Sequence, residues 1–303
     1  MKVLVTGADG FIGRYLTEML GDQDIGCCAA NHYDIDVTHP NGFRPFDGID
    51  FDAVIHLAAK LMINGHTPEE YFEANTLGTL NVLEFCRRNK IPKLIYAMTH
   101  SDTNLIGQGK IYPYGSQMYG TTSWEHNAIP FIQSKVAAAD MVEAYNRMKV
   151  VKGYILRLAN IRGYGSSDTK YNSPFHQFIN KARNGEPIEV WGDPPTTARD
   201  FIYIKDVCDA FIKAVETEDA PVGYYNIGSG KPLTILDEIK AICRVFCHID
   251  NPSKIIMRPD ISEVRTKGSN FDIEKSIKYL NWVPKYNYDA ALVDFKREAG
   301  WID

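Results

Sequence analysis

The sequence predicts an α/β protein with a doubly wound, mostly parallel sheet, and three observations support this. First, an apolar run of strand length at residues 2–6 leads into three glycines spaced G-x-x-G-x-x-G, and a helical pattern follows. Second, strand-like and helical runs alternate over about the first 160 residues. Third, the 303 residues are 45% hydrophobic and 23% charged, the balance of a globular protein with a large core. A smaller α/β unit in the C-terminal half completes the expected fold.

The glycine-rich turn consists of Gly7, Gly10 and Gly13 and joins the first strand to a helix expected from Gly10 to Leu20. Glycine lets the backbone approach a ligand closely, and a helix N-terminus offers free N–H groups and the positive end of a dipole. A strand before the turn and a helix after it are typical of a phosphate cradle. We therefore expect a dinucleotide at this turn.

The second expected strand spans residues 26–30. In dinucleotide-binding folds, an acidic residue near the end of this strand holds the ribose hydroxyls of NAD. Here Asn31 and His32 occupy that place, and Asp34 and Asp36 come slightly later. No arginine stands beside Asn31 to meet the 2′-phosphate of NADP. The sequence therefore leaves the choice between NAD and NADP open.

A third buried strand is expected within residues 53–59, which end in Ala58 and Ala59. Small side chains at this end would let a dinucleotide lie against the backbone. The segment Thr67-Pro68-Glu69-Glu70 has the form of a capping box with proline at the first helical position. One long helix should therefore run from there through Asn89.

A fourth strand is expected at residues 93–98, and Thr99 follows at its C-terminal end, where open parallel sheets place their chemistry. Residues 103–130 show no clear periodicity, and so long a connection is usually functional. An amphipathic helix at 131–148 and a fifth strand at 153–159 continue the alternation.

The pattern changes after Asn160, where shorter elements predict a second, smaller domain that is interleaved with the first. The expected elements are a helix at about 175–183, short strands at 199–204 and 224–228, and a helix from Asp206; the segment 187–195 lies between the first helix and the first strand. We predict that the dinucleotide-binding domain comprises residues 1–162 plus about 199–227. The second domain would comprise about 163–198 plus 228–303.

The bulk composition narrows the function classes. A net charge of −5 provides no basic field for nucleic acid, and no apolar run approaches membrane-spanning length. The first strand begins at residue 2 or 3, which leaves no room for a signal peptide, so we expect the protein in the cytoplasm. The six cysteines include no CxxC pair and are expected to be reduced, packed thiols.

Seven short segments occur in a characteristic order along nearly the whole chain. They are Thr6-Gly7-Ala8-Asp9-Gly10-Phe11-Ile12-Gly13, Val54-Ile55-His56-Leu57-Ala58-Ala59, Asn75 with Gly78-Thr79, Leu156-Arg157-Leu158-Ala159-Asn160, Arg199-Asp200-Phe201, Tyr225-Asn226-Ile227-Gly228-Ser229-Gly230 and Trp282-Val283-Pro284. Together they resemble the extended short-chain dehydrogenase/reductase family, specifically its NAD-dependent nucleotide-sugar epimerases and dehydratases. The resemblance implies a Rossmann sheet that binds NAD and a C-terminal lobe that binds a nucleotide sugar. It also implies a homodimer formed through the helices at about 67–89 and 132–148.

The resemblance assigns binding roles to particular residues. The residues implied at the cofactor are Gly7, Gly10, Phe11, Ile12, Gly13, Asn31, Asp36, Val37, Leu57, Ala58, Ala59 and Lys135. The residues implied at the substrate are Asn160, His176, Arg199 and Arg265. Arginine suits a diphosphate because it makes bidentate, charge-assisted hydrogen bonds to phosphate.

The catalytic residues of this chain depart from the family pattern. The family uses a Ser or Thr, a Tyr, and a Lys four residues after the Tyr, and the Lys lowers the pKa of the phenol. Thr99 matches the Ser/Thr and Lys135 the Lys, but Phe131 occupies the Tyr position, 32 residues after Thr99. A phenyl ring has no proton to exchange, so the usual base is absent.

Three hypotheses follow, and the sequence leaves them open. In the first, a displaced Tyr119 or Tyr114, or His126, supplies the base, and the enzyme isomerises the sugar by transient oxidation. Epimerisation is then the leading reaction class, with Thr99 and Lys135 polarising and positioning the sugar. Another hypothesis is that the protein binds a nucleotide sugar and catalyses nothing.

The remaining hypothesis is a non-redox isomerisation, such as pyranose–furanose ring interconversion. His100, Asp102, His126 and His176 would then act as acid and base or bind a divalent metal. These residues come from separate loops and lack the spacing of metal ligands, so we predict no metal site.

Overall fold

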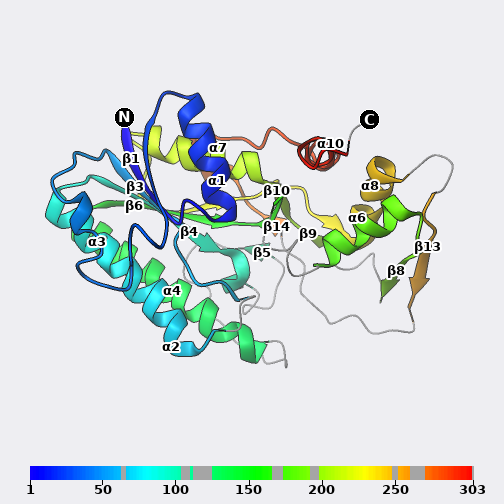
Figure 1. The fold of residues 1–303 in the computed structure, drawn as a ribbon, viewed down its shortest axis with the longest axis horizontal. Helices are drawn as coiled ribbons and strands as arrows, with labels where there is room; N and C mark the ends of the chain where they lie inside the picture. The colour runs from blue at the N-terminus through cyan, green and yellow to red at the C-terminus, as the bar shows by residue number, and fades with distance from the viewer. Residues whose placement is uncertain are drawn as a thin grey trace.

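The large lobe is built on a six-stranded sheet (Figure 1). The computed structural model describes residues 1–62, 66–103, 110–111, 125–165, 173–191, 198–247, 252–259 and 270–301. The strands, in spatial order, are β11 (Gly223–Ile227), β6 (Lys152–Leu158), β4 (Lys93–Thr99), β3 (Ala53–His56), β1 (Lys2–Thr6) and β2 (Gly26–Ala30). All five neighbouring pairs run parallel, which confirms the predicted doubly wound sheet.

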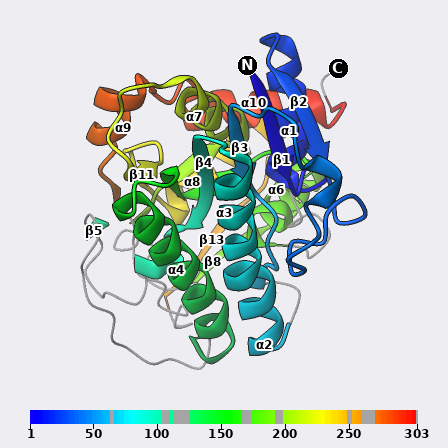
Figure 2. The same cartoon turned by 90° about the vertical axis from the view of Figure 1, so that its left-hand side faces the viewer.

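Helices cover both faces of the sheet, as Figures 1 and 2 show. Helices α1 (Phe11–Asp22) and α7 (Ile204–Glu216) pack on one face, and α3 (Gly78–Asn89) and α4 (Glu125–Arg147) pack on the other. The alternation of side chains along β1 explains this arrangement: Val3 and Val5 join the core under α1 and α7, whereas Leu4 joins the core under α3 and α4. A strand buried on both faces therefore reads as a continuous apolar run.

The helix expected from residue 67 to Asn89 is present but carries a π-helical turn. It consists of α2 (Pro68–Tyr71), a π-helix at Phe72–Leu77, and α3. Its predicted capping box is confirmed, because Thr67 Oγ1 accepts the N–H of Glu70 at 3.3 Å and the Glu70 carboxylate accepts the N–H of Thr67 at 2.8 Å. The extra residue in the π-helical turn rotates Asn75 into the interior.

Two expected boundaries were wrong by a few residues. Helix α4 begins at Glu125 instead of Phe131, and Pro130 lies inside it. The strand expected at 199–204 is interrupted at Asp200, and α7 begins directly after it at Ile204. The buried carboxylate of Asp200 accepts the N–H groups of Ser229 and Gly230 at 2.7 and 2.9 Å, which fixes the turn that follows β11. The long connection expected at 103–130 lies largely outside the described residues.

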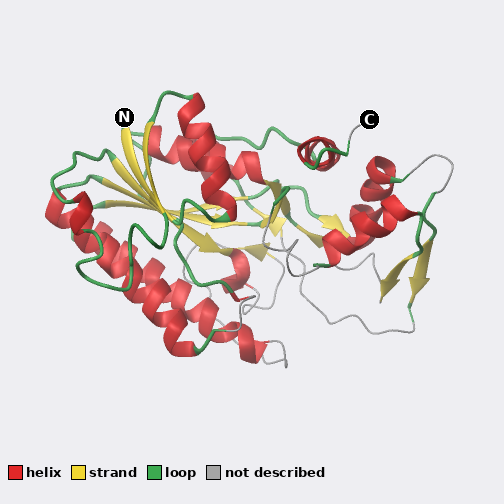
Figure 3. Ribbon diagram, in the orientation of Figure 1, coloured by secondary structure: helices red, strands yellow, loops and turns green. Residues whose placement is uncertain are grey.

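The smaller lobe assembles from segments that are far apart in sequence, as the colours of Figure 1 show, and it combines helices with a pair of short strands (Figure 3). Its elements are α6 (Pro174–Asn184), β8 (Ile188–Trp191), α8 (Ile235–Phe246), β13 (Ile255–Arg258) and α10 (Tyr288–Glu298). Its core includes Phe175, Ile188, Ile242 and Phe295. The chain returns to the large lobe between α6 and α8 to form α7 and β11, so the two lobes are interleaved.

The remaining described elements are short. They are the strand pairs β7 (Asn160–Arg162) with β10 (Phe201–Tyr203), β9 (Ala198–Arg199) with β12 (Leu233–Thr234), and β5 (Lys110–Ile111) with β14 (Asn270–Phe271), together with α9 (Glu274–Leu280) and 3-10 turns at Arg44–Phe46 and His100–Thr103. Across the described part of the chain, every helix is too short or too polar to cross a membrane.

Candidate functional site

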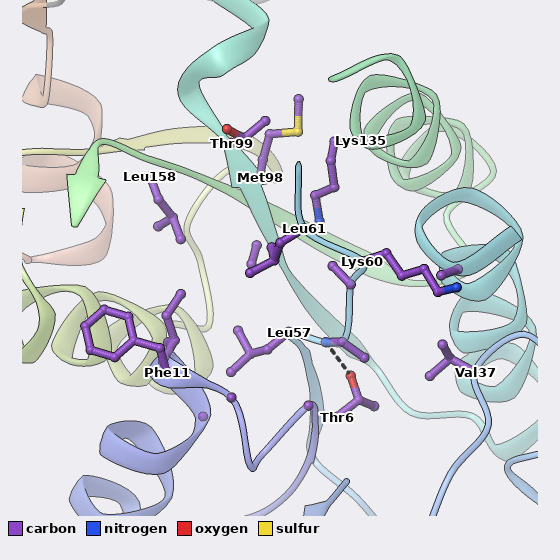
Figure 4. A pocket seen from close by; sticks show the side chains of 18 of the residues that line it. Thr6, Phe11, Val37, Leu57, Lys60, Leu61, Met98, Thr99, Lys135 and Leu158 are labelled. Carbon is purple, nitrogen blue, oxygen red and sulfur yellow. Dashed lines mark hydrogen bonds between the residues drawn. The ribbon is translucent and has the colours of Figure 1, made fainter. Parts of the chain in front are cut away.

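A cavity of about 700 Å³ lies at the C-terminal ends of β1, β3, β4 and β6 (Figure 4). This is the edge of a parallel sheet where ligands bind in doubly wound folds. Every residue implied at the cofactor lines the cavity: Gly7, Gly10, Phe11, Ile12, Gly13, Asn31, Asp36, Val37, Leu57, Ala58, Ala59 and Lys135. Thr99, Phe131 and Asn160 line it as well.

The glycine turn has the close contacts expected of a phosphate cradle. Gly7 has a φ of +70°, and a methyl group added to it would lie 2.7 Å from the backbone nitrogen of Ala58. A methyl group on Gly13 would lie 2.4 Å from the carbonyl oxygen of Gly7. The N-cap residue of α1 is Gly10, which has no side chain to accept hydrogen bonds from the first N–H groups of the helix. These N–H groups can therefore bind an anion in the cavity. The turn therefore fits the diphosphate of a dinucleotide.

The end of β2 uses its own polar side chains to build a turn. Asn31 Oδ1 accepts the N–H of Tyr33 at 2.8 Å, and the Asp34 carboxylate accepts the N–H of Asn31 at 3.0 Å. Asp9, from the glycine turn, lines this end of the cavity, and its carboxylate lies 3.5 Å from His32 Nδ1. The exposed side chain of Asp36 lines the cavity as well.

A buried hydrogen-bonded chain supports the floor of the cavity. Ala58 N donates to Thr6 Oγ1 at 3.3 Å (dashed in Figure 4), and Thr6 Oγ1 lies 2.8 Å from His56 Nδ1. His56 Nε2 lies 3.1 Å from Thr79 Oγ1, which donates to the carbonyl of Asn75 at 2.6 Å. Because Thr79 donates to Asn75, it accepts from His56 Nε2–H, and His56 Nδ1 accepts the Thr6 hydroxyl. Burial, and secondarily the charge of Lys135, lowers the pKa of His56 to about 3, so the ring is neutral.

Asn75 extends this support to helix α4. Its Oδ1 accepts the N–H of Lys60 at 2.8 Å, and its Nδ2 donates to the carbonyl of Lys60 at 3.1 Å and to Ser134 Oγ at 3.0 Å. Thr76 Oγ1 donates to the carbonyl of Ser134 at 2.9 Å. The π-helical turn therefore fixes both the loop after β3 and the backbone that carries Lys135.

The reaction end of the cavity brings Thr99 near the helix that carries Phe131 and Lys135. Thr99 Oγ1 lies 3.1 Å from Ser101 Oγ and accepts the N–H of Ser101. The ring of Phe131 is 7% exposed and packs edge-on against Tyr71, with ring centroids 5.8 Å apart. The side chain at the position where the resemblance implies a phenol is thus apolar and belongs to a small hydrophobic cluster.

Lys135 extends from α4 into the cavity (Figure 4) and is 5% exposed. Its Nζ lies 4.3 Å from the centroid of the Tyr96 ring. Among the described residues, no carboxylate forms an ion pair with it. Burial lowers the pKa of Lys135 to about 7.

The residues predicted to bind the substrate do not all line the cavity. Asn160 donates from Nδ2 to the carbonyl of Asp200 at 3.0 Å. Arg199 lies on β9, opposite Leu233 of β12, and does not line the cavity. His176 lies inside the smaller lobe, with Nδ1 3.0 Å from Ser173 Oγ, and does not line the cavity either.

The other candidate acids, bases and metal ligands are only partly described. His100 lines the cavity at the end of β4, where burial lowers its pKa to about 4 and Nδ1 lies 3.1 Å from the carbonyl of Leu158. Outside the described part lie Tyr112, Tyr114, Tyr119 and Arg265, and the side chains of Asp102 and His126. Within the described part, no three His, Cys, Asp or Glu side chains gather closely enough to hold a metal ion.

The sequence analysis missed Arg162, which lines the cavity on the same face of β7 as Asn160. Its guanidinium donates from Nε and Nη2 to buried Glu238 at 3.1 and 2.9 Å. It is also sandwiched between Phe175 and Phe201, whose ring centroids lie 4.5 and 4.4 Å away. The alternation of side chains along the strand could have indicated Arg162 from the position of Asn160. Its partner, Glu238, is 76 residues away in sequence and could not be predicted in this way.

Comparisons with known proteins agree with this geometry. The model of the NAD dependent epimerase/dehydratase family matches residues 3–228. A UDP-glucuronate 4-epimerase of Thermodesulfobacterium geofontis is 28% identical over 331 residues, which cover 98% of this chain and 95% of that protein. The structure of UDP-glucose 4-epimerase from Thermotoga maritima with UDP-glucose has a TM-score of 0.79 at 22% identity, covering 99% of both chains. That of Thermus thermophilus UDP-glucose 4-epimerase with NAD has a TM-score of 0.74 at 22% identity, covering 99% of this chain and 100% of the other.

Proposed function

This chain belongs to the NAD-dependent epimerase/dehydratase family, and from that premise we propose that it is an enzyme that epimerises the sugar of a nucleotide sugar, with NAD as its cofactor. One observation carries the proposal: a glycine cradle at the start of α1 opens into the same cavity as Thr99 and Lys135. When bound, NAD supplies reversible acceptance of a hydride from a sugar carbon. The side chains of this protein would bind and orient the substrate and exchange the proton.

The cofactor contacts follow from the cavity. The N–H groups around Gly10 and Gly13 would bind the diphosphate, and Ala58 would lie beneath the dinucleotide on a floor held by Thr6 and His56. Thr99 would hold a sugar hydroxyl by a hydrogen bond and so fix which carbon faces the nicotinamide. This assignment does not identify the group that exchanges the proton of the sugar hydroxyl. The candidates predicted from the sequence are Tyr119, Tyr114 and His126.

The substrate is proposed to be a UDP-sugar. A relative similar over nearly its whole length is a UDP-glucuronate 4-epimerase, and one structural neighbour holds UDP-glucose. Asn160, Arg199 and Arg265 would bind the diphosphate of the nucleotide sugar. His176 would contribute to substrate binding from within the smaller lobe. Arg162 lies between the lobes at the cavity wall and would hold the smaller lobe against the bound nucleotide sugar.

We also propose a cytoplasmic homodimer that forms through the face carrying α3 and α4. Phe72 and Leu77 support this interface because they are apolar, 39% and 50% exposed, and lie in the π-helical turn that leads into α3. Exposed apolar side chains on neighbouring turns of one helix are typical of a surface that a second copy covers.

The test of the function is an NMR assay of the purified protein with UDP-, dTDP- and GDP-hexoses, with and without added NAD. We expect the sugar signals of one UDP-hexose to convert to those of its epimer until equilibrium is reached. The Gly13→Ala variant is the control, because it obstructs the cradle and should abolish conversion. Binding of nucleotide sugars without any conversion would show instead that the protein is a catalytically silent binder.

A second candidate, isomerisation without hydride transfer, is favoured by the phenyl ring of Phe131 at the phenol position. It predicts a pyranose–furanose pair of products and no exchange of label from NAD deuterated at C4 of the nicotinamide. Epimerisation by transient oxidation predicts a pair of pyranoses. Transfer of deuterium between cofactor and product would exclude the non-redox candidate.

A further inference from the structure

The described cavity lacks a phenol, although two tyrosines lie nearby. Tyr71 is buried, and its hydroxyl donates to the carbonyls of Leu61 and Met62 at 3.4 and 3.3 Å. Tyr96 is fully buried, its hydroxyl donates to the carbonyl of Lys135, and burial raises its pKa well above the ordinary value. Neither side chain lines the cavity. These two rings therefore cannot restore the hydroxyl that Phe131 lacks.

Lys135 lines the same cavity as Thr99, and no carboxylate among the described residues forms an ion pair with its amine. It follows Phe131 by four residues on α4, so the two side chains lie on one face of the helix. The titratable groups that face its amine among the described residues are Tyr96, from β4, and His56, from β3, and both are neutral. Phe131, which belongs to a small hydrophobic cluster, lines the same cavity and adds an apolar wall to it.

The electrostatic balance favours a neutral amine. A buried ammonium without a carboxylate loses several kcal/mol of hydration, whereas an aromatic ring face returns only about 0.5–2 kcal/mol. The result is the fall in the pKa of Lys135 to about 7, so a large fraction of the amine carries a free lone pair at neutral pH. A general base with this property is best suited to operate near pH 7.

We propose that Lys135 itself exchanges the proton of the reacting sugar hydroxyl, in the place of the missing phenol. The inference rests on the proposed function. The Nζ lone pair takes the hydroxyl proton, so that an O–H bond breaks and an N–H bond forms. The C–H electron pair leaves the same carbon as hydride to the oxidised nicotinamide cofactor, and the C–O bond becomes a carbonyl. On the return step the ammonium gives the proton back as the hydride re-adds, and the enzyme is unchanged.

The supporting shell is built to hold this amine in place. Ser134, the residue before Lys135, is fixed by Asn75 through its hydroxyl and by Thr76 through its carbonyl. The backbone of Lys135 is therefore held while its four-carbon side chain retains reach into the cavity. Thr99 lines the same cavity and would hold the hydroxyl oxygen by a hydrogen bond.

The first test measures the amine itself and does not depend on turnover. Protein labelled with ¹³C at lysine Cε is titrated by NMR without cofactor, and the Lys135 signal is assigned by its loss in Lys135→Met. We expect the Lys135 signal to titrate near pH 7, several units below the ordinary value for a lysine amine. Titration of Lys135 at the ordinary lysine value would overturn the inference, whatever the protein turns out to catalyse.

The second test uses turnover of the UDP-sugar. Lys135→Arg keeps a positive charge that does not deprotonate, so we expect at least a 100-fold loss in kcat. Added methylamine should partly restore Lys135→Ala, and the restored rate should rise with pH as the free amine is released. Full activity of Lys135→Arg would contradict the proposal, as would a rescue that falls as pH rises.

The alternative bases are separated in the same assay. The proposal expects Tyr112→Phe, Tyr114→Phe, Tyr119→Phe and His126→Ala, singly and together, to keep a pH–rate profile whose ascending limb follows Lys135. Loss of that limb in one of these variants would assign the proton transfer to the changed residue and reject Lys135. Absence of turnover in the unmodified protein would reject the proposed function, while the NMR titration would still decide the state of the amine.

Discussion

Nδ2 of Asn75 lies 3.0 Å from Oγ of Ser134, and this hydrogen bond joins the π-helical turn to α4 one residue before Lys135. We predict that Asn75→Ala lowers the free energy of unfolding by about 2–3 kcal/mol, because buried polar groups of Lys60 and Ser134 lose their partner. Urea unfolding and NADH binding measure the effect. Asn184→Ala, which removes an exposed contact to Glu186, should cost less than about 1 kcal/mol. Equal losses in both variants would contradict a special role for Asn75.

Two glycines of α1 provide a matched pair. A methyl group on Gly13 would meet the backbone of Gly7 and Ala8 at 2.4–2.6 Å, whereas one on Gly21 would have nothing within 4 Å. We predict that Gly13→Ala abolishes NADH binding, measured by fluorescence titration. Gly21→Ala should leave binding intact and raise stability by about 0.5–1 kcal/mol, because alanine favours the helix. Intact binding in Gly13→Ala would mean that the cofactor does not use this turn.

The stability of the protein should fall on acidification because two buried histidines stay neutral when folded. His56 and His100 have pKa values lowered to about 3 and 4. Between these values and the ordinary value near 6.5, the unfolded chain binds protons that the folded protein does not. At pH 5 each histidine should therefore cost about 2 kcal/mol relative to neutral pH.

Urea unfolding at pH 7 and pH 5 tests this origin. His56→Gln should lose about 2 kcal/mol less between the two pH values than the unmodified protein. His39→Gln, at an exposed position, should lose as much as the unmodified protein. Identical pH dependence in His56→Gln would show that His56 is not the source.

Asp9 should set the preference between the two dinucleotides. Its carboxylate faces the end of β2, so the 2′-phosphate of NADP would meet a like charge. We predict that Asp9→Asn improves NADPH binding relative to NADH by about 1 kcal/mol, roughly fivefold. Asp34→Asn is the control, because Asp34 accepts a hydrogen bond within the turn and should leave the ratio unchanged. A changed ratio only in Asp34→Asn would assign the preference to the turn.

The proposed dimer is tested on its exposed apolar side chains. Leu77→Asp should yield a monomer in light scattering coupled to gel filtration, because a buried, unpaired carboxylate opposes the interface. Ile277→Asp, on α9, changes a similarly exposed side chain at a distance from α3 and should remain a dimer. If the unmodified protein is a monomer in this measurement, the proposed homodimer is rejected.

The parts of this fold that the sequence predicts are those set by local rules. The alternation of Val3, Leu4 and Val5 is enough to identify a strand buried on both faces, and Thr67 and Glu70 suffice to place a helix start. The π-helical turn could not be predicted in this way. It forms because Asn75 reaches Lys60 and Ser134, and the latter is 59 residues away in sequence.

The same distinction applies to the candidate site. The residues that line the proposed cofactor cavity were predicted because a glycine turn and small residues at strand ends are recognisable in the sequence itself. The neutral state of His56 and Lys135 was not predictable, since it depends on which groups are absent around them after folding. The pairing of Arg162 with Glu238 likewise depends on how α8 returns to β7.

The interleaving of the lobes has a consequence for how the protein is made. Helix α10 supplies Phe295 to the smaller core, while the hydroxyls of Tyr15 and Tyr203 bind the Glu298 and Asp294 carboxylates of that helix. Because α10 follows the glycine turn and β4 in the sequence, it emerges from the ribosome after both of them. A nascent chain can therefore build the glycine turn and its neighbouring strands before the smaller core is complete.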